Sequence, residues 1–328
     1  LMYINQAFEL SMVLDRDRFD KVLNRTGYLE ETDGWYIDSS FAVKGILVKY
    51  RDSQYKKKVR LIIHPGLIFD SAEQDPDRFV RKLDKRIGRY FGDKYRLDDF
   101  DLSGMALTVD MDVGSRENAA AYLKVIQRIG RVKGFSPSEY DCFEEGTSFC
   151  LDGNSNGIIF WIYDLERMAV GHLEETGISA KKLKSVRRDL EGVLRTEVRL
   201  TKLKTVRNYA GTDNASSQIP VLLENGKDVF LDTFMKIIPY GDFYKIDKAA
   251  EIVQNRVADR ILRRRMLRLL ALIPEKKSLY LAWKAMNCRN IEKVMEAFSD
   301  INVSPVTISR RHNVKFLKNL YDYILAQA

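Results

Sequence analysis

The segment Leu107-Thr-Val-Asp-Met-Asp-Val113 alternates strictly between apolar and polar residues. Successive residues of a β-strand point to opposite faces of a sheet, so the alternation predicts a strand with one face in the core. The opposite face carries Thr108, Asp110 and Asp112. The segment therefore predicts a sheet that is packed on one side and polar on the other, as antiparallel sheets commonly are.

Two further segments predict strands of the same domain. Gly157-Ile-Ile-Phe-Trp-Ile-Tyr163 is apolar on both faces, which indicates a buried central strand that ends in a tyrosine. Leu194-Arg-Thr-Glu-Val-Arg-Leu200 alternates again, and its polar face carries Glu197 between Arg195 and Arg199. If this strand lies beside the first one, carboxylates from both strands meet on the polar face.

Strands and helices recur in a similar order in two parts of the chain. The first part contains predicted strands at 3–14, 41–51 and 57–63 and helices at 16–24 and 76–90. The second part contains predicted strands at 105–113, 147–151, 157–163 and 194–202 and helices at 116–129 and 179–190. Two similar β-α-β-β-α units predict an α+β fold, in which helices pack on antiparallel β-sheets.

Composition suggests a division into three parts. Residues 1–210 form the expected α+β domain, built from pseudo-repeats 1–100 and 101–210. Gly, Thr, Asn and Ser accumulate between positions 208 and 220, so residues 211–250 are expected to be a linker. Residues 251–328 are expected to form an all-helical C-terminal domain.

The positive charge lies in that last part. Residues 251–328 contain 15 Lys and Arg against 7 Asp and Glu, whereas residues 1–250 contain 39 of each, so the whole excess of +8 is C-terminal. A field concentrated in one segment favours a polyanionic partner such as DNA, although a basic surface also serves solubility.

Two features of the C-terminal part fit DNA. Residues 259–270 predict a basic amphipathic helix whose Arg263, Arg264 and Arg265 either follow phosphates or form a solvated face. Residues 290–299 and 305–317 predict two more helices, separated by a turn in which Asn302 takes the left-handed conformation. The second of these resembles a recognition helix of a helix-turn-helix, capped by Ser304 and begun by Pro305. The residues expected to contact DNA from it are Thr307, Arg310 and Arg311.

The composition is that of a soluble globular protein, with 45% hydrophobic and 30% charged residues. The longest apolar stretches are too short to cross a bilayer and the N-terminus lacks the pattern of a secretory signal, so we expect a cytoplasmic protein without membrane contact. The three cysteines have no CxxC spacing, which argues against a zinc site or a disulfide framework.

The polar face of the sheet is the candidate site. Asp110, Asp112 and Glu197 offer hard oxygen ligands, which suit Mg²⁺ or Mn²⁺. Alternatively, acids on the polar face of a strand meet solvent or pair with arginines. Tyr163 leaves a core strand at its polar end, where it is either a nucleophile or a packed aromatic whose hydroxyl is satisfied.

The order of the three motifs, at 107–112, 153–163 and 194–200, resembles that of the filamentous-phage gene II replication proteins and the related initiators and relaxases of rolling-circle plasmids. The resemblance spans roughly residues 40 to 205 and rests on motif order and spacing together. It implies that Asp110 and Glu197 hold the metal, with Asp112 as a companion, and that Tyr163 is the nicking nucleophile.

The chain departs from that family at positions that often carry Arg or Lys, where it has Asn154, Asn156 and Leu165. Phosphate binding would then fall to Arg167, Arg195 or Arg199, or else the activity is reduced.

The resulting expectation is a rolling-circle replication initiator that nicks and joins origin DNA, single-stranded and duplex, through a 5′-phosphotyrosine. A relaxase of a mobile element has the same chemistry, and a non-catalytic DNA-binding regulator on the same scaffold is the alternative from another class. A second copy of the chain and a host helicase are the further partners expected.

Overall fold

The computed structural model describes residues 5–27, 29–68, 75–138, 146–175, 179–288 and 290–326, and the fold is α+β as predicted. Within these residues, ten strands form one antiparallel sheet in the order β2-β3-β4-β5-β1-β6-β10-β9-β8-β7. The strands are β1 (Asn5–Leu14), β2 (Glu30–Thr32), β3 (Trp35–Asp38), β4 (Ile46–Asp52), β5 (Lys57–Ile63), β6 (Asp101–Asp112), β7 (Ser136–Pro137), β8 (Ser148–Gly153), β9 (Ile158–Asp164) and β10 (Val193–Leu200).

The two pseudo-repeats share this single sheet, and β6 belongs to both. The element orders β1-α1-β4-β5-α2-β6 and β6-α3-β8-β9-α4-α5-β10 are alike. The strand orders differ, because β1 lies beside β5, whereas its counterpart β6 is separated from β9 by β10. The repetition therefore holds for the order of elements along the chain and not for strand pairing.

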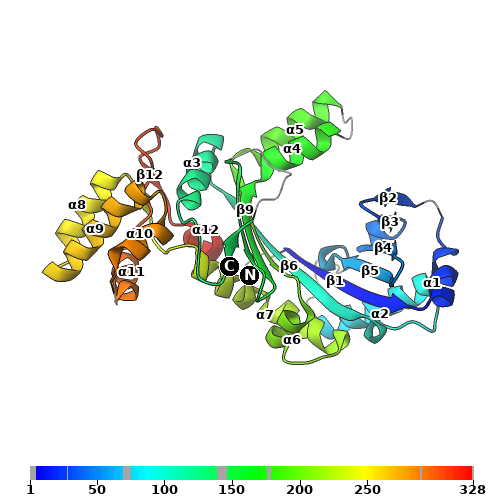
Figure 1. The fold of residues 1–328 in the computed structure, drawn as a ribbon. Helices are drawn as coiled ribbons and strands as arrows, with labels where there is room; N and C mark the ends of the chain where they lie inside the picture. Colours follow the sequence, from blue (N-terminus) through cyan, green and yellow to red (C-terminus); the bar gives the residue numbers. More distant parts are fainter. Residues whose placement is uncertain are drawn as a thin grey trace.

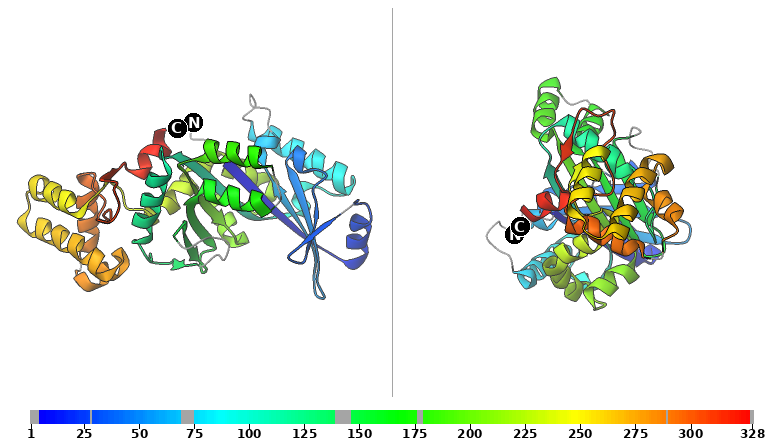
Figure 2. Two further views of the ribbon diagram at one scale, coloured as in Figure 1. Left: turned by 90° about the horizontal axis from the view of Figure 1, so that it is seen from above. Right: turned by 90° about the vertical axis from the view of Figure 1, so that its left-hand side faces the viewer.

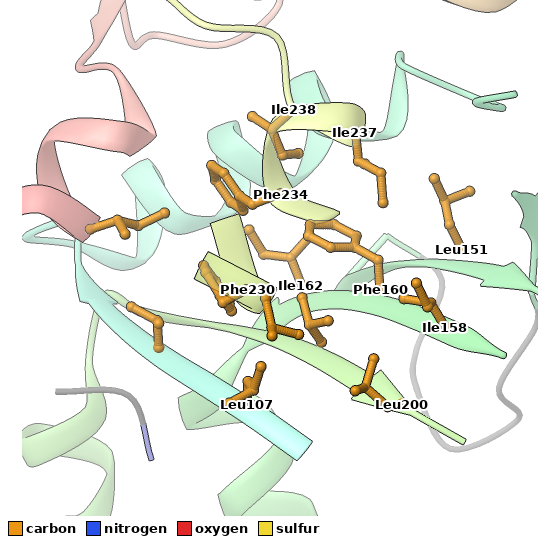
Figure 3. Packing of buried hydrophobic residues seen from close by; sticks show 14 of the residues in the cluster. Leu107, Leu151, Ile158, Phe160, Ile162, Leu200, Phe230, Phe234, Ile237 and Ile238 are labelled. Atoms are coloured by element: carbon orange, nitrogen blue, oxygen red, sulfur yellow. The ribbon is translucent and has the colours of Figure 1, made fainter. Parts of the chain in front are cut away.

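One face of the sheet carries the main core. The alternation predicted for residues 107–113 is confirmed, since Leu107, Val109, Met111 and Val113 are all at most 3% exposed. The helices that cover this face are α1 (Arg16–Leu23), α2 (Pro76–Phe91), α3 (Arg116–Gln127), α6 (Leu203–Ala210), α7 (Ala215–Ile237) and α12 (Leu320–Ala326). Figure 3 shows Phe230 and Phe234 of α7 packed over the side chains of β9 and β10.

The other face is partly covered by a helical hairpin. It consists of α4 (Leu165–Glu175) and α5 (Ala180–Leu190), which project from the end of β9 (Figure 1). Helix α5 buries none of its residues, and α4 begins directly where β9 ends. Helix α4 was not predicted; it begins at Leu165, directly after β9 ends at Asp164, with no Gly or Pro to mark a boundary.

The prediction that residues 211–250 form a linker is wrong. Gly211 ends α6 in the left-handed conformation, and the polar residues after it are only a short turn before α7. Helix α7 spans 23 residues and packs on the sheet. Its buried residues, among them Ile219, Leu222, Phe230 and Phe234, recur at helical spacing, which is the signal that the polar turn obscured.

The C-terminal region is largely helical, with α8 (Ile246–Arg256), α9 (Arg260–Lys276), α10 (Leu279–Met286) and α11 (Ile291–Asp300). Figure 2 shows these helices at one end of the molecule, beyond α3. A short pair of strands, β11 (Phe243–Tyr244) and β12 (Phe316–Leu317), joins the start and the end of this region. The helices predicted at 259–270 and 290–299 are confirmed.

The predicted recognition helix at 305–317 is absent. Residues 303–308 are buried and not helical, with a bend at 305 and 306, and Val303 and Ile308 form parallel bridges with Asp242 and Lys245. Val306 and Ile308 alternate with polar residues, so the period of a strand competes with that of a helix here. Asn302 does adopt the left-handed conformation, at φ 53°, but it belongs to a turn between α11 and this bridged segment.

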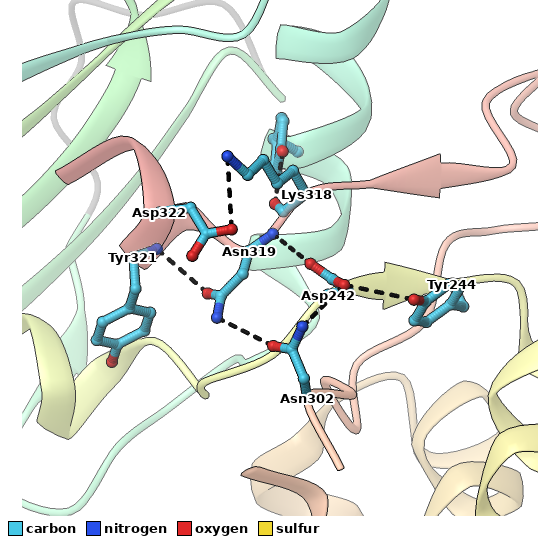
Figure 4. Close-up of polar contacts among 8 residues, drawn as sticks. Asp242, Tyr244, Asn302, Lys318, Asn319, Tyr321 and Asp322 are labelled. Atoms are coloured by element: carbon cyan, nitrogen blue, oxygen red, sulfur yellow. Dashed lines mark hydrogen bonds and ion pairs between the residues drawn. The ribbon is translucent and has the colours of Figure 1, made fainter. Parts of the chain in front are cut away.

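Polar contacts hold the start of this bridged segment and α12 in place (Figure 4). The Asp242 carboxylate accepts hydrogen bonds from the Asn319 backbone at 2.8 Å and from the Asn302 amide at 2.9 Å. Tyr321 of α12 donates to the carbonyl of Ile238 at 2.7 Å and is 7% exposed. The chain end is thus packed against the sheet domain. No helix within the described ranges is long and apolar enough to cross a membrane.

Candidate active site

The sheet brings the three motifs onto adjacent strands. In the register of β9, β10 and β6, Tyr163 lies opposite Arg195, which lies opposite Asp110. Directly paired residues share a face, so the three side chains stand in a row on the polar side of the sheet. Motifs separated by up to 85 residues thereby meet at one place.

Arg195 is the centre of this row. Its guanidinium donates two hydrogen bonds to the Asp110 carboxylate, at 2.6 and 2.7 Å. Such a forked pair fixes the orientation of both groups. Arg195 also hydrogen-bonds the Tyr163 side chain, and the two interactions raise the pKa of the guanidinium, chiefly through Asp110. The guanidinium is therefore held between the Asp110 carboxylate and the Tyr163 hydroxyl.

Tyr163 is buried, at 3% exposure, in a small apolar cluster between the sheet and α4. Its ring lies 4.8 Å from that of Trp161, and Leu165 and Cys150 complete the surroundings. Burial, together with the negative charge of Glu197, raises the pKa of the Tyr163 hydroxyl to about 12, and Arg195 opposes that rise. The phenol is consequently protonated at neutral pH.

Glu197 lies two residues after Arg195 on β10 and on the same face of the sheet. It is 5% exposed and accepts a hydrogen bond from Arg199 at 2.5 Å. The Arg199 guanidinium also lies 5.7 Å from the centre of the Trp161 ring. A buried carboxylate is costly unless it is paired, and Arg199 supplies that pairing.

Asp112 lies apart from the other two acids. It is exposed at the end of β6, opposite Val193, and accepts a hydrogen bond from the Gly114 backbone at 2.9 Å. Val193, the partner of Asp112, lies four residues before Glu197 on β10, which corresponds to about 13 Å along the strand. Asp110 and Glu197 thus flank Arg195, while Asp112 does not join them.

No three His, Cys, Asp or Glu side chains converge on one point in the described parts of the chain. Asp110 and Glu197 instead alternate with Arg195 and Arg199. The pairing with arginines, which the sequence left open as an alternative to metal binding, is the arrangement that the structure contains.

Arg167 lies beside the row, in the first turn of α4, 3.7 Å from the Asp164 carboxylate. It lines an open pocket of about 250 Å³ together with Val170, Glu166, Arg116 and Arg187. No local sequence pattern indicated this pocket, because its arginines come from α3, α4 and α5, which only the fold brings together.

The arginines of α9 divide into two sets. Arg264 and Arg265 are exposed as predicted, whereas Arg263 is half-buried and donates to the Val257 carbonyl at 3.3 Å. Arg260 and Arg268 extend the exposed stripe at spacings of four residues, a helical signal that the prediction did not use.

The residues assigned to the recognition helix have other positions. Thr307 is 1% exposed and its carbonyl accepts a hydrogen bond from Arg128, so its prediction as a DNA contact is wrong. Arg310 pairs with Asp247 at 3.2 Å, and Arg311 is exposed. Both arginines lie in a turn and not on a helix.

Comparison of the chain with protein-family models finds no match, and neither characterised proteins nor solved structures give one.

Proposed function

We propose that this protein is a rolling-circle replication initiator that nicks and rejoins DNA through Tyr163. The observation that carries the proposal is the row formed by Tyr163, Arg195 and Asp110 on three adjacent strands. The strand register aligns three motifs that were recognised separately in the sequence. A nucleophile, a cation and a carboxylate that orients the cation are the parts that such a transfer needs.

In the proposed reaction, the Tyr163 oxygen attacks the phosphorus of a phosphodiester. The bond from phosphorus to the 3′-oxygen breaks, and the 5′-phosphate stays on the tyrosine. The phenolic proton first passes to hydroxide or water, because the attacking form is the phenolate, which Arg195 favours and Glu197 opposes. The leaving 3′-oxygen takes up a proton from water, and attack by a 3′-hydroxyl later reverses the reaction.

Arg195 has two roles in this scheme. It favours the phenolate form of Tyr163, and its charge stabilises the extra negative charge on the phosphate during transfer. Asp110 keeps the guanidinium in position through the forked pair. In this arrangement Asp110 is a positioning residue.

The family resemblance also implies Mg²⁺ or Mn²⁺ at Asp110, Asp112 and Glu197. As they are placed, the three do not form a set of ligands for one ion, because two hold guanidinium groups and Asp112 lies apart. An ion at Asp110 or Glu197 would have to displace Arg195 or Arg199. A metal ion at this site therefore remains a proposal, and the reaction described for Tyr163 and Arg195 does not require it.

Access to Tyr163 requires a movement of the α4–α5 hairpin, since Leu165 belongs to the apolar cluster that contains the tyrosine, and Met168 and Leu190 pack against that cluster. The hairpin is suited to contact with DNA because α5 carries five cations and one acid: Lys181, Lys182, Lys184, Arg187, Arg188 and Asp189. We infer that DNA attracts the hairpin and that its displacement exposes the phenol.

A relaxase of a mobile element would use the same residues. A non-catalytic DNA-binding regulator is the second candidate, and the burial of Tyr163 is the observation that favours it. The proposed function places the protein in the cytoplasm with DNA, a second copy of the chain and a host helicase as partners.

The test uses a library of supercoiled plasmids with random inserts, incubated with the full chain and Mn²⁺ or Mg²⁺. We expect relaxed circles with protein linked to a 5′ end, and we expect Tyr163→Phe to lose them while it keeps DNA affinity. Tyr209→Phe is the matched control, because Tyr209 is a hydrogen-bonded tyrosine of α6 that bonds Asp232 at 2.7 Å. Bound but intact circles with the parent protein would support the regulator.

A further inference from the structure

The N-terminal half of the sheet has a face that the proposed reaction does not use. Helices α1 and α2 pack on the side of Tyr50, Val59 and Leu61, all of which are fully buried. The opposite side of β3, β4 and β5 carries a basic patch, defined here as Trp35, Lys49, Arg51, Lys58 and Arg60. Each of these residues is exposed or half-buried.

Strand register places the patch residues together. Lys49 is paired with Arg60, and Arg51 is paired with Lys58. The backbone positions of the four cationic residues thus form a rectangle with sides of about 5 Å across the strands and about 7 Å along them. Like charges in direct opposition on a sheet are destabilising, so this arrangement is maintained against its own repulsion.

The crowding has a measurable electrostatic effect. Partial burial lowers the pKa of the Lys58 ammonium, and Arg60, Lys56 and Arg51 lower it further, while Glu9 opposes them. Glu9 is the acid that pairs with Arg60, at 3.1 Å. Glu30 of β2 lies on the same face, since it is paired with Ile37, which is paired with Lys49. Two carboxylates against four cations still leave a local excess of positive charge.

Trp35 adds an aromatic surface to the patch. Its ring lies 4.5 Å from the Arg60 guanidinium and 5.6 Å from that of Arg51. Cations around an exposed aromatic ring are the recurring elements of single-strand nucleic-acid sites, where phosphates meet the cations and a base stacks on the ring. A duplex offers phosphates but keeps its bases stacked inside.

We propose that the basic patch binds single-stranded DNA. The phosphates would meet Lys49, Arg51 and Lys58, and one base would stack on Trp35. The inference rests on the proposed function for the identity of the polymer, since a nicked duplex yields a single strand. The patch and Tyr163 lie on the same face of one sheet, roughly 35 Å apart by strand spacing and rise.

The test measures binding of the full chain to labelled oligothymidine of about 16 nucleotides, by fluorescence anisotropy at several salt concentrations. The triple variant Lys49→Gln, Arg51→Gln and Lys58→Gln should bind about tenfold or more weakly, and its salt slope should fall by about 2, since each phosphate contact on a single strand contributes about 0.7. The control triple variant has the same net charge and replaces three exposed lysines on the helix side: Lys21, Lys85 and Lys94.

Trp35→Leu should weaken binding roughly 5- to 150-fold without a change in salt slope, because stacking involves no counterions. Oligothymidine should quench the tryptophan fluorescence of the parent and of Trp283→Phe, and should not quench that of Trp35→Leu. Thermal melts check that each variant is folded, which is expected because the replaced cations reach the surface.

Parent-like affinity and salt slope in the patch triple variant, or an equal loss in the control, would overturn the proposal. An equal effect of Trp35→Leu on heparin, which has no bases, would show a general polyanion site and also overturn it. The measurements are made with a chelator, so that no cleavage occurs. Failure to nick with intact single-strand binding would count against Tyr163 alone, and nicking without patch binding would count against the patch alone.

Discussion

The ionisation of Tyr163 should control the rate of nicking. With a pKa raised to about 12, the phenolate fraction at neutral pH is on the order of 10⁻⁵, and it rises tenfold with each pH unit. If the phenolate is the attacking species, the rate of a single turnover should rise with the same slope between pH 7 and 9. The pKa of Tyr163 is higher in the folded protein than in the unfolded chain, so its contribution to stability is fully present below about pH 10 and is lost above that. The pH range of the assay lies below this limit, so ionisation of Tyr163 does not unfold the protein during the measurement.

Arg195→Gln is the informative perturbation. It removes the cation that lowers the Tyr163 pKa and keeps a polar side chain at the same place. Each unit by which the Tyr163 pKa then rises slows the reaction about tenfold, equivalent to about 1.4 kcal/mol, so we expect at least that loss at every pH. Asp110 is 44% exposed, and water can replace the lost partner without unfolding the protein.

The assay is single-turnover formation of the covalent adduct with a labelled substrate, selected from the plasmid library and resolved on denaturing gels. Arg207→Gln is the matched control, since it removes the same charge from the far side of the sheet, where Arg207 pairs with Asp213 at 3.2 Å. A rate independent of pH, or parent-like activity of Arg195→Gln, would refute the assignment of Arg195 as the group that favours the phenolate.

Three further predictions concern the metal, the chain end and α9. Mn²⁺ should raise the melting temperature of the parent more than that of Asp110→Asn or Glu197→Gln, and equal shifts would mean that these carboxylates hold no ion. Ile324→Ala, at a fully buried position of α12, should cost about 2–5 kcal/mol in urea unfolding, and a loss below about 1 kcal/mol would contradict the docking of that helix. Replacing both Arg264 and Arg268 with Gln should lower the salt slope of duplex binding by about 2, and an unchanged slope would remove α9 from the interface.

Period alone was sufficient to predict the central strands. The segments 107–113 and 194–200 alternate because one side of the sheet is packed and the other polar, and the structure confirms both faces. Residues 157–163 are apolar on both faces because α4 and α5 cover the second side locally. In each case the burial of side chains follows directly from the position of the strand, so a local pattern contains the information.

Strand register and long-range strand pairing could not be predicted from local sequence patterns. The sequence placed Asp110 and Glu197 on polar faces, but only strand pairing shows that Arg195 lies between Asp110 and Tyr163. The segment 303–308 contains Ser304 and Pro305, which favour the start of a helix, and it also alternates between apolar and polar residues, which favours a strand. Its bridges to Asp242 and Lys245, about 60 residues away, hold it in a non-helical form.

Strand β6 runs through both halves of the sheet and pairs with β1 on one side and β10 on the other. Two domains joined by a linker can change their separation, whereas a hydrogen-bonded strand shared by both halves restricts such movement. The shared strand therefore limits how far the spacing between the basic patch and Tyr163 can change. If one strand of DNA occupied both sites, the number of nucleotides between the bound base and the cleaved bond would vary little from one complex to the next.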